Sequence, residues 1–364
     1  MTAPAVRRTS LDVLRGLAVL IMIEAHVIDS WTREGDRHST AFGESLILGG
    51  FGAPLFLFLA GVTVAMSAGS KARRLGDDGL AARAVMRRGL EIFALAFLFR
   101  FQSFVLSHAP AWTLLKVDVL NIMGPAIVVA AALWFVARSG AARIVVFAVA
   151  TLAVVLVTPA IRHIGALAAI PDALEGYLRP VPDLTNFSYF PWAAFVTGGA
   201  IVGVLLDGAR DRARDVKVNV GFLAAGLLVA GIAYQAAWWT PLDPRSRFWT
   251  TSLSFYLIRL GLMVAAVGAA WAWDRRPRPR GWSPLELLGQ TSLFIYWIHV
   301  ELVYGVISNP LHGAFSLRGA WTALVGFWIL MLGAAALKTD VARKWRNRKD
   351  LHDKVGRPVE RLMF

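Results

Sequence analysis

Long runs of apolar residues recur through the whole chain, and each is close to the length that a helix needs to cross a bilayer. A spanning helix requires about 20 residues, most of them apolar. Because hydrocarbon offers no hydrogen-bond partners, a segment that crosses it satisfies its own backbone as a helix. We expect ten such helices, at residues 10–31, 49–67, 90–107, 119–137, 144–159, 190–206, 218–238, 252–273, 287–308 and 320–337.

The composition of the 364-residue chain supports an all-α, polytopic transmembrane bundle over residues 1–337. Hydrophobic residues make up 57% of the chain, charged residues only 17%, and the mean hydropathy is +0.56. These values are typical of a polytopic membrane protein rather than a soluble domain. There is no cysteine, so neither a disulfide nor a thiolate nucleophile contributes. Residues 338–364 are predicted to form a basic cytoplasmic tail.

The basic residues are divided unequally between the two sides that the predicted helices define. With the N-terminus inside, the cytoplasmic segments hold 27 Lys and Arg residues and the external loops hold 8. This excess follows the positive-inside rule, so both termini are predicted to be cytoplasmic. The same distribution explains the net charge of +14 by contact with membrane lipids, without a nucleic-acid partner.

The first predicted span carries ionisable side chains that an anchoring helix would not need, namely Asp12, Arg15, Glu24, His26 and Asp29. Charged groups at membrane depth face a protein interior or a water-filled cavity. Arg15 and His26 are close to three helical turns apart, so they share one face at a separation of roughly 16 Å. One end of that face offers a fixed cation, and the other offers a titratable base.

Two interpretations are open for each end of this face. His26 could hold helices together by bonding to a neighbouring carboxylate such as Asp29, which lies one turn further on and could orient its ring. It could also act as a general base, since the pKa of histidine lies near neutrality, or carry an acyl group itself. Arg15 could extend toward the lipid headgroups or pair with Asp12, or it could contact an anionic substrate.

These residues resemble a known family. The run LDVLRGLAVLIMIEAH has the Arg-x10-His pattern of the first helix of acyltransferase family three. The segments RTSLDVLRG and FGAPLFLFLAGVTVAMSAGSKARR also resemble the bacterial relatives of heparan-α-glucosaminide N-acetyltransferase, and TSLFIYWIHVELVYG extends the resemblance. The resemblance covers most of the chain and is strongest over residues 8–75 and 284–305.

The resemblance implies an integral-membrane acyltransferase of a bacterial inner membrane. Such an enzyme would move an acyl group, here expected to be acetyl, from cytoplasmic acyl-CoA to an amino or hydroxyl group of a sugar or glycolipid acceptor. Acyl-CoA would be a substrate, so no bound cofactor is expected. A multi-pass transporter or flippase that uses the same buried ionisable residues is the alternative. Whether the chain forms a homo-oligomer is left open.

The resemblance also implies roles for individual residues. His26 would be the catalytic histidine and Arg15 would contact the donor, while Asp29, by its position one turn beyond His26, could assist it. His38 is the rival catalytic residue, because the N-acetyltransferases that the chain resembles place their proposed active histidine in the loop after the first helix.

Further polar residues are predicted to contact the donor. Arg100 lies near the middle of the third span, where it must face protein or a cavity. Asp118 and Asn121 introduce the fourth span, and His299 lies within the ninth, where a purely packing role is the alternative. The long external stretch 160–189 is expected to form a wall or lid for an acceptor. No cluster of His, Asp or Glu has the spacing of metal ligands, so no metal site is predicted.

Overall fold

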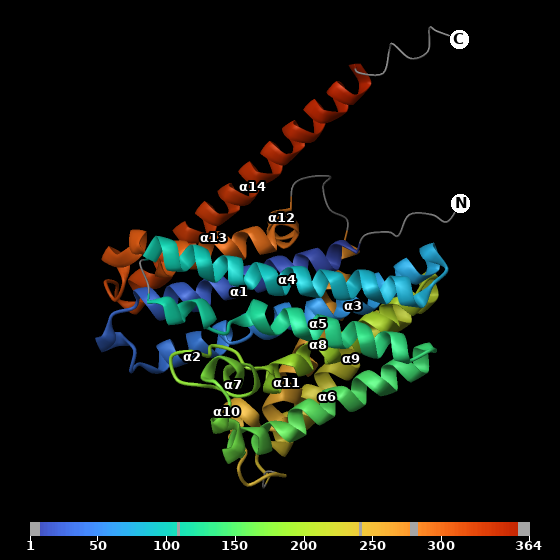
Figure 1. Cartoon of the computed structure of the whole chain (residues 1–364), viewed down its shortest axis with the longest axis horizontal. Coiled ribbons are helices and arrows are strands. Elements are labelled where there is room, and N and C mark those ends of the chain that lie inside the picture. Colours follow the sequence, from blue (N-terminus) through green and yellow to red (C-terminus); the bar gives the residue numbers. More distant parts are fainter. Residues whose placement is uncertain (1–7, 108–109, 240–241, 277–282, 356–364) are drawn as a thin grey trace.

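The computed structural model describes residues 8–107, 110–239, 242–276 and 283–355, and regular secondary structure within these ranges is helical (Figure 1). Short 3-10 helices occur at Glu34–Asp36, Ala111–Leu115, Gly165–Ala169 and Val306–Leu311. The α-helices are α1 (Thr9–Trp31), α2 (Thr40–Gly49), α3 (Gly52–Leu75), α4 (Asp78–Ser107), α5 (Val119–Val136), α6 (Gly140–His163), α7 (Asp172–Leu178), α8 (Tyr189–Gly208), α9 (Arg212–Ala236), α10 (Phe248–Thr251), α11 (Leu253–Asp274), α12 (Pro284–Gln290), α13 (Ser292–Tyr304) and α14 (Leu317–Val355).

Within the described residues, 8 helical segments are long and apolar enough to cross a membrane, which confirms the predicted all-α polytopic bundle. Two of the ten predicted spans are outside this set. One is α1, which carries several charged side chains, and the other is the short pair α12 and α13, of which α13 has only 13 residues. Both lie within the bundle, since α1 packs against α3, α12, α13 and α14.

The basic segments of the sequence meet at one end of the bundle, here called the basic end. There the guanidinium of Arg73 lies 2.6 Å from the carboxylate of Asp207, and that of Arg143 lies 2.9 Å from Asp78. The opposite end, here called the loop end, contains α2, α7 and α10 (Figure 1). This grouping is the one that the charge distribution predicts for helices that cross in alternating directions.

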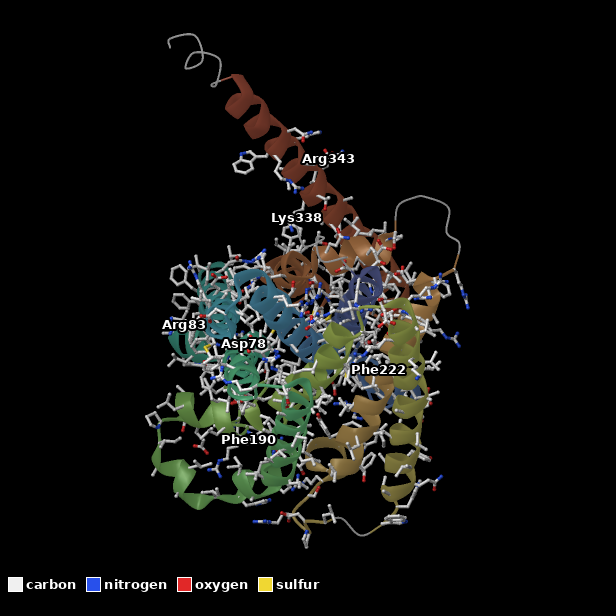
Figure 2. The ribbon with its side chains drawn as sticks, turned by 90° about the vertical axis from the view of Figure 1, so that its right-hand side faces the viewer. Asp78, Arg83, Phe190, Phe222, Lys338 and Arg343 are labelled. Atoms are coloured by element: carbon white, nitrogen blue, oxygen red, sulfur yellow. The ribbon has the colours of Figure 1, made fainter. Side chains whose placement is uncertain are left out.

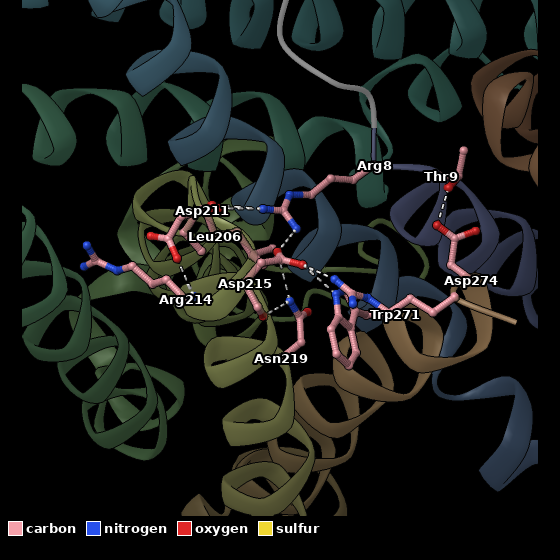
Figure 3. Close-up of polar contacts among 11 residues, drawn as sticks. Arg8, Thr9, Leu206, Asp211, Arg214, Asp215, Asn219, Trp271 and Asp274 are labelled. Atoms are coloured by element: carbon pink, nitrogen blue, oxygen red, sulfur yellow. Dashed lines mark hydrogen bonds and ion pairs between the residues drawn. The ribbon is translucent and has the colours of Figure 1, made fainter.

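Asp215, in the first turn of α9, joins the start of α1 to the end of α11 at the basic end (Figure 3). Its carboxylate accepts hydrogen bonds from Arg8 Nη1 at 2.6 Å, from Trp271 Nε1 at 2.7 Å and from Arg275 Nη2 at 3.2 Å. Since Arg8 precedes α1 while Trp271 and Arg275 lie at the end of α11, this carboxylate links three helices at the basic end.

Replacing Asp215 by asparagine is therefore expected to lower the free energy of unfolding by about 1–3 kcal/mol, because two arginines lose their charged acceptor. The melting temperature of the purified protein in detergent measures the loss. Asp211→Asn is the matched control, since Asp211 caps α9 through the backbone N–H of Arg214 and asparagine caps equally well. Equal melting temperatures for wild type and Asp215→Asn would contradict this account.

Small residues allow α3 and α8 to pack closely. A Cβ atom on Gly61 would lie 1.8 Å from the carbonyl oxygen of Val196, and one on Gly199 would lie 2.0 Å from that of Phe58. Only glycine fits at such distances, so these two positions set how closely the helices approach.

At the loop end, Asp36 connects the segment after α1 to the start of α14. Its carboxylate accepts from the backbone N–H of Leu317 at 2.8 Å and pairs with Arg33 at 3.2 Å. The hydrogen bond from Leu317 and the neighbouring guanidinium of Arg33 lower the pKa of Asp36. The contribution of this contact to stability is therefore present above the ordinary carboxyl pKa and is lost as the pH falls through the lowered value.

Several predicted spans differ from the helices that form. The run predicted at 49–67 continues to Leu75 as α3, and Gly76, with φ of 71°, ends it in the left-handed region. The run predicted at 287–308 is divided between α12 and α13 at Thr291, whose φ of −107° and ψ of 10° are not helical. The Thr291 hydroxyl donates to the carbonyl oxygen of Leu287 at 2.8 Å.

The C-terminal helix α14 is longer than the predicted span 320–337. It runs without a break to Val355, so the predicted basic tail begins inside a helix. Figure 2 shows Lys338 and Arg343 on the part of α14 that extends beyond the other helices. Residues 356–364 of the predicted tail lie outside the described residues.

Candidate active site

A cavity of about 1130 Å³ extends between α1, α3, α4, α5, α12 and α13. Its wall includes Lys71, near the end of α3 at the basic end, and Lys116, which precedes α5 at the loop end. Arg15 and His26 both line it, as expected for two residues on one face of α1. Because α1 is continuous, they are roughly 16 Å apart along the helix axis. The cavity therefore runs lengthwise through much of the bundle.

His26 is hydrogen-bonded to a second histidine, on α13. Nδ1 of His26 lies 3.0 Å from Nε2 of His299, and the two rings are parallel within 4°. Nδ1 of His299 lies 2.7 Å from the carbonyl oxygen of Ile295. Since a carbonyl oxygen only accepts, Nδ1 of His299 carries a proton, and Nε2 of the neutral ring is an acceptor. His26 must then donate from Nδ1, which leaves a lone pair on Nε2 of neutral His26.

The two histidines occupy different environments. His299 is 0% exposed and is absent from the residues that line the cavity, whereas His26 forms part of the wall. His299 thus fixes the ring and the tautomer of His26 from behind, as a buried carboxylate does for the histidine of a Ser-His-Asp triad. A fixed lone pair in a polar cavity is suited to accept a proton from a hydroxyl or amino group.

Asp29 reaches His26 through a tyrosine. Tyr304 donates to the Asp29 carboxylate at 3.0 Å, and its ring packs edge-on against His26 with the ring centres 5.4 Å apart. From the sequence, Asp29 was one candidate to orient the His26 ring, but in the structure Nδ1 of His26 is hydrogen-bonded to His299. Asp29 and Tyr304 both line the cavity, so they help to define its shape beside the histidine.

Arg15, in the cavity wall, contacts the carboxylate of Asp12 and the hydroxyl of Thr63. Its Nη1 lies 3.2 Å from Oδ1 of Asp12, and its Nη2 donates to the hydroxyl of Thr63 at 3.3 Å. The pairing with Asp12 was one of the alternatives drawn from the sequence. Arg15 also forms part of the cavity wall.

Three residues predicted to contact the donor lie together at the loop end. Arg100 and Asp118 form an ion pair in the cavity wall, with Nη2 and Oδ2 2.6 Å apart. Asn121 is 1% exposed and outside the wall. Its side-chain oxygen accepts from the backbone N–H of Asp118 at 3.1 Å, and its amide nitrogen donates to Tyr177 at 3.3 Å. Asn121 therefore caps α5 and positions Asp118.

His38, the rival of His26, lies outside the cavity. Its side chain is 84% exposed, and its Nε2 is 4.0 Å from the carboxylate of Glu34 in the 3-10 helix after α1. The structure brings His26 together with Arg15 and Asp29 around one cavity and leaves His38 in solvent.

The cavity wall also contains residues that the sequence did not single out. Tyr296 hydrogen-bonds the Asp118 carboxylate and lines the cavity. It lies one helical turn before His299, in the segment TSLFIYWIHVELVYG, so its position in that segment was the available signal. From the external stretch 160–189, Thr185, Asn186 and Phe187 line the cavity, as expected of a wall. Across the described ranges, no group of three or more His, Asp or Glu is placed to hold a metal.

Comparison with known families agrees with this arrangement. Residues 8–339 match acyltransferase family three, described as an acyltransferase domain. The chain belongs to this family of membrane acyltransferases. The matched region of the acyltransferase includes every helix that lines the cavity and ends in α14, near the predicted boundary at residue 337. No curated protein matches the chain, so the resemblance to N-acetyltransferases of heparan-α-glucosaminide enters only as a hypothesis.

Proposed function

We propose that this acyltransferase moves an acetyl group from acyl-CoA, bound from the basic end, to an amino or hydroxyl group of a sugar or glycolipid at the loop end. The observation that carries the proposal is the lone pair of His26, held by His299 in a cavity that extends from Lys71 to Lys116. By the positive-inside rule the basic end faces the cytoplasm, where acyl-CoA is available. In a bacterium the membrane would be the inner membrane.

In the proposed reaction, the acceptor oxygen or nitrogen attacks the thioester carbonyl carbon while Nε2 of His26 takes the proton of the acceptor. The bond to the acceptor forms, the carbon–sulfur bond breaks, and CoA leaves as a thiolate that receives the proton from His26. His299 keeps the lone pair of His26 aimed at the cavity before each turnover. A variant of the scheme, in which Nε2 carries the acetyl group transiently, uses the same atom.

The first test is donor binding and turnover by the purified protein in nanodiscs. Acetyl-CoA is titrated, and free CoA is followed with and without sugar acceptors. Saturable binding and release of CoA support the proposal. A transporter or flippase would move its solute without consuming the thioester, so transport with no CoA release would favour that alternative. Absence of binding by acetyl-CoA and by longer acyl-CoA donors would overturn the acyltransferase mechanism proposed for this cavity.

Two adjacent arginines of α4 test where the phosphates of the donor bind. Arg88 lines the cavity, whereas Arg87 does not, although both pair with Glu91 at 3.1 and 3.3 Å. We expect Arg88→Ala to raise the KM for acetyl-CoA about tenfold, because a charge-assisted hydrogen bond to phosphate is lost. Arg87→Ala, the matched control, should leave the KM unchanged. Equal KM values for the two variants would place the phosphates elsewhere.

A further inference from the structure

A second cavity, of about 240 Å³, lies at the loop end between α6, α8, α10 and α11. It adjoins the main cavity, because Thr185, Asn186 and Trp192 form part of both walls. The two cavities therefore lie side by side at these residues.

The charges in the second cavity are all of one sign. Arg162 of α6 and Arg259 of α11 line it, and no Asp or Glu of the described residues does. The Nε atom of each arginine is buried without a hydrogen-bond partner, and in the described part of the chain neither side chain has a carboxylate at salt-bridge distance. Arg247 lies near enough to add electrostatic repulsion on Arg162. Partly buried arginines without a counter-charge are suited to bind an anion.

Arg259 is positioned at the boundary between the two cavities. Its guanidinium lies over the ring of Phe255, 4.0 Å from the ring centre. A Cβ atom built on Gly50, a residue of the main cavity wall, would lie 2.8 Å from its Nη2. A guanidinium that packs over an aromatic ring can still present N–H groups at its edge to an oxyanion.

Aromatic rings make up much of the remaining wall, and these include Trp192, Trp249 and Tyr256. Such rings offer flat apolar faces with a polar edge, which pack against the C–H faces of a sugar while hydroxyl groups meet polar atoms. Two arginines and several aromatic rings in one small cavity favour a ligand that is both anionic and saccharide.

We propose that the second cavity binds an anionic group, a phosphate or carboxylate, carried by the saccharide acceptor, and that Arg162 and Arg259 hold it. The inference rests on the proposed function for the identity of the ligand as an acceptor. The acyltransferase would then select anionic over neutral saccharides, with the hydroxyl or amino group that is acylated extending past Trp192 toward His26.

The test uses protein in phosphatidylcholine nanodiscs and two sets of probes, the 1-phosphates of glucose, galactose and mannose and the methyl glycosides of the same sugars. We expect calorimetry to detect binding of at least one sugar phosphate and to show weaker or no binding of its methyl glycoside. Arg162→Gln and Arg259→Gln should each weaken sugar-phosphate binding about tenfold, and Arg259→Lys should weaken it less. Arg245→Gln is the matched control, because Arg245 pairs with Asp243 outside the cavity.

Folding of each variant is checked by its melting temperature and its elution volume. If no sugar phosphate binds, or if phosphates and methyl glycosides bind equally, the proposal is overturned. Phosphatidylglycerol nanodiscs separate the two sources of phosphate. In those discs the protein could lose its binding of sugar phosphate and instead bind phosphatidylglycerol, in a way that requires Arg162 and Arg259. That result would assign the cavity to a lipid headgroup.

The outcome is independent of the donor experiment. Sugar-phosphate binding that depends on both arginines, in a protein that does not bind acetyl-CoA, would leave the anion site standing and refute the acyltransferase mechanism. Acetyl-CoA turnover without selectivity for anionic sugars would support the acyltransferase mechanism and refute the anion site.

Discussion

Replacing His26 by alanine is expected to lower the turnover of acetyl-CoA by about 10²–10⁴-fold, the usual contribution of a positioned general base. The reason is specific to one atom, since Nε2 of His26 is the nitrogen left with a lone pair when Nδ1 donates to His299. Release of free CoA by the purified protein measures the effect, and a normal yield of inserted protein shows that folding is intact.

His38→Ala is the matched control for this experiment, because it removes a histidine that is 84% exposed and outside the cavity. Its turnover should equal that of the wild type. Near-normal turnover of His26→Ala with loss of activity in His38→Ala would exchange the roles of the two histidines. It would also require the loop after α1 to move to the cavity.

Replacing His299 by leucine is expected to lower kcat by about 10–100-fold, the usual cost of losing a group that orients a functional histidine. His299 lies behind His26 and outside the cavity wall, so the KM for acetyl-CoA should stay the same. The separate effects on kcat and KM identify it as a positioning residue rather than a donor ligand.

His299→Gln distinguishes hydrogen bonding from packing. The glutamine side-chain oxygen can accept from Nδ1 of His26, whereas leucine fills the space without an acceptor. Glutamine should therefore recover part of the kcat that leucine loses, in proteins with matching melting temperatures. An equal loss in both variants, or a rise in the KM for acetyl-CoA, would rule out the positioning role.

Sequence reasoning located the bundle and one half of the site because both depend on local pattern. The apolar runs predict helices from length alone, and the spacing of Arg15 and His26 along one continuous helix predicts that both face one cavity. No knowledge of neighbouring helices is needed for either inference, since both residues belong to α1.

The other half of the site depends on contacts between distant parts of the chain. His26 and His299 are 273 residues apart in sequence, and only the packing of α1 against α13 brings them together. The role of Asn121 could not be predicted for the same reason. Its side-chain amide accepts from the backbone N–H of Asp118 in the cap of α5 and donates to Tyr177. A lone polar residue at the start of a helix looks the same in sequence whether it faces a ligand or a backbone N–H.

The break between α12 and α13 was missed for a different reason. Thr291 lies within an apolar run that is long enough for a single span, and threonine is common in membrane helices. In the structure its φ of −107° and ψ of 10° leave the helical region. Hydropathy does not register a local change of backbone angles, so the run appears continuous in the sequence.

Because α14 continues unbroken past Lys338, a helix extends beyond the spanning bundle and can serve as a site for fusing another domain. From that residue to Val355 a straight helix extends about 25 Å, at 1.5 Å for each residue. A small rigid domain fused in helical phase near Val355 would keep one orientation relative to the spanning helices. Such a fusion would give single-particle electron microscopy a feature for alignment outside the detergent belt, while leaving both cavities unmodified.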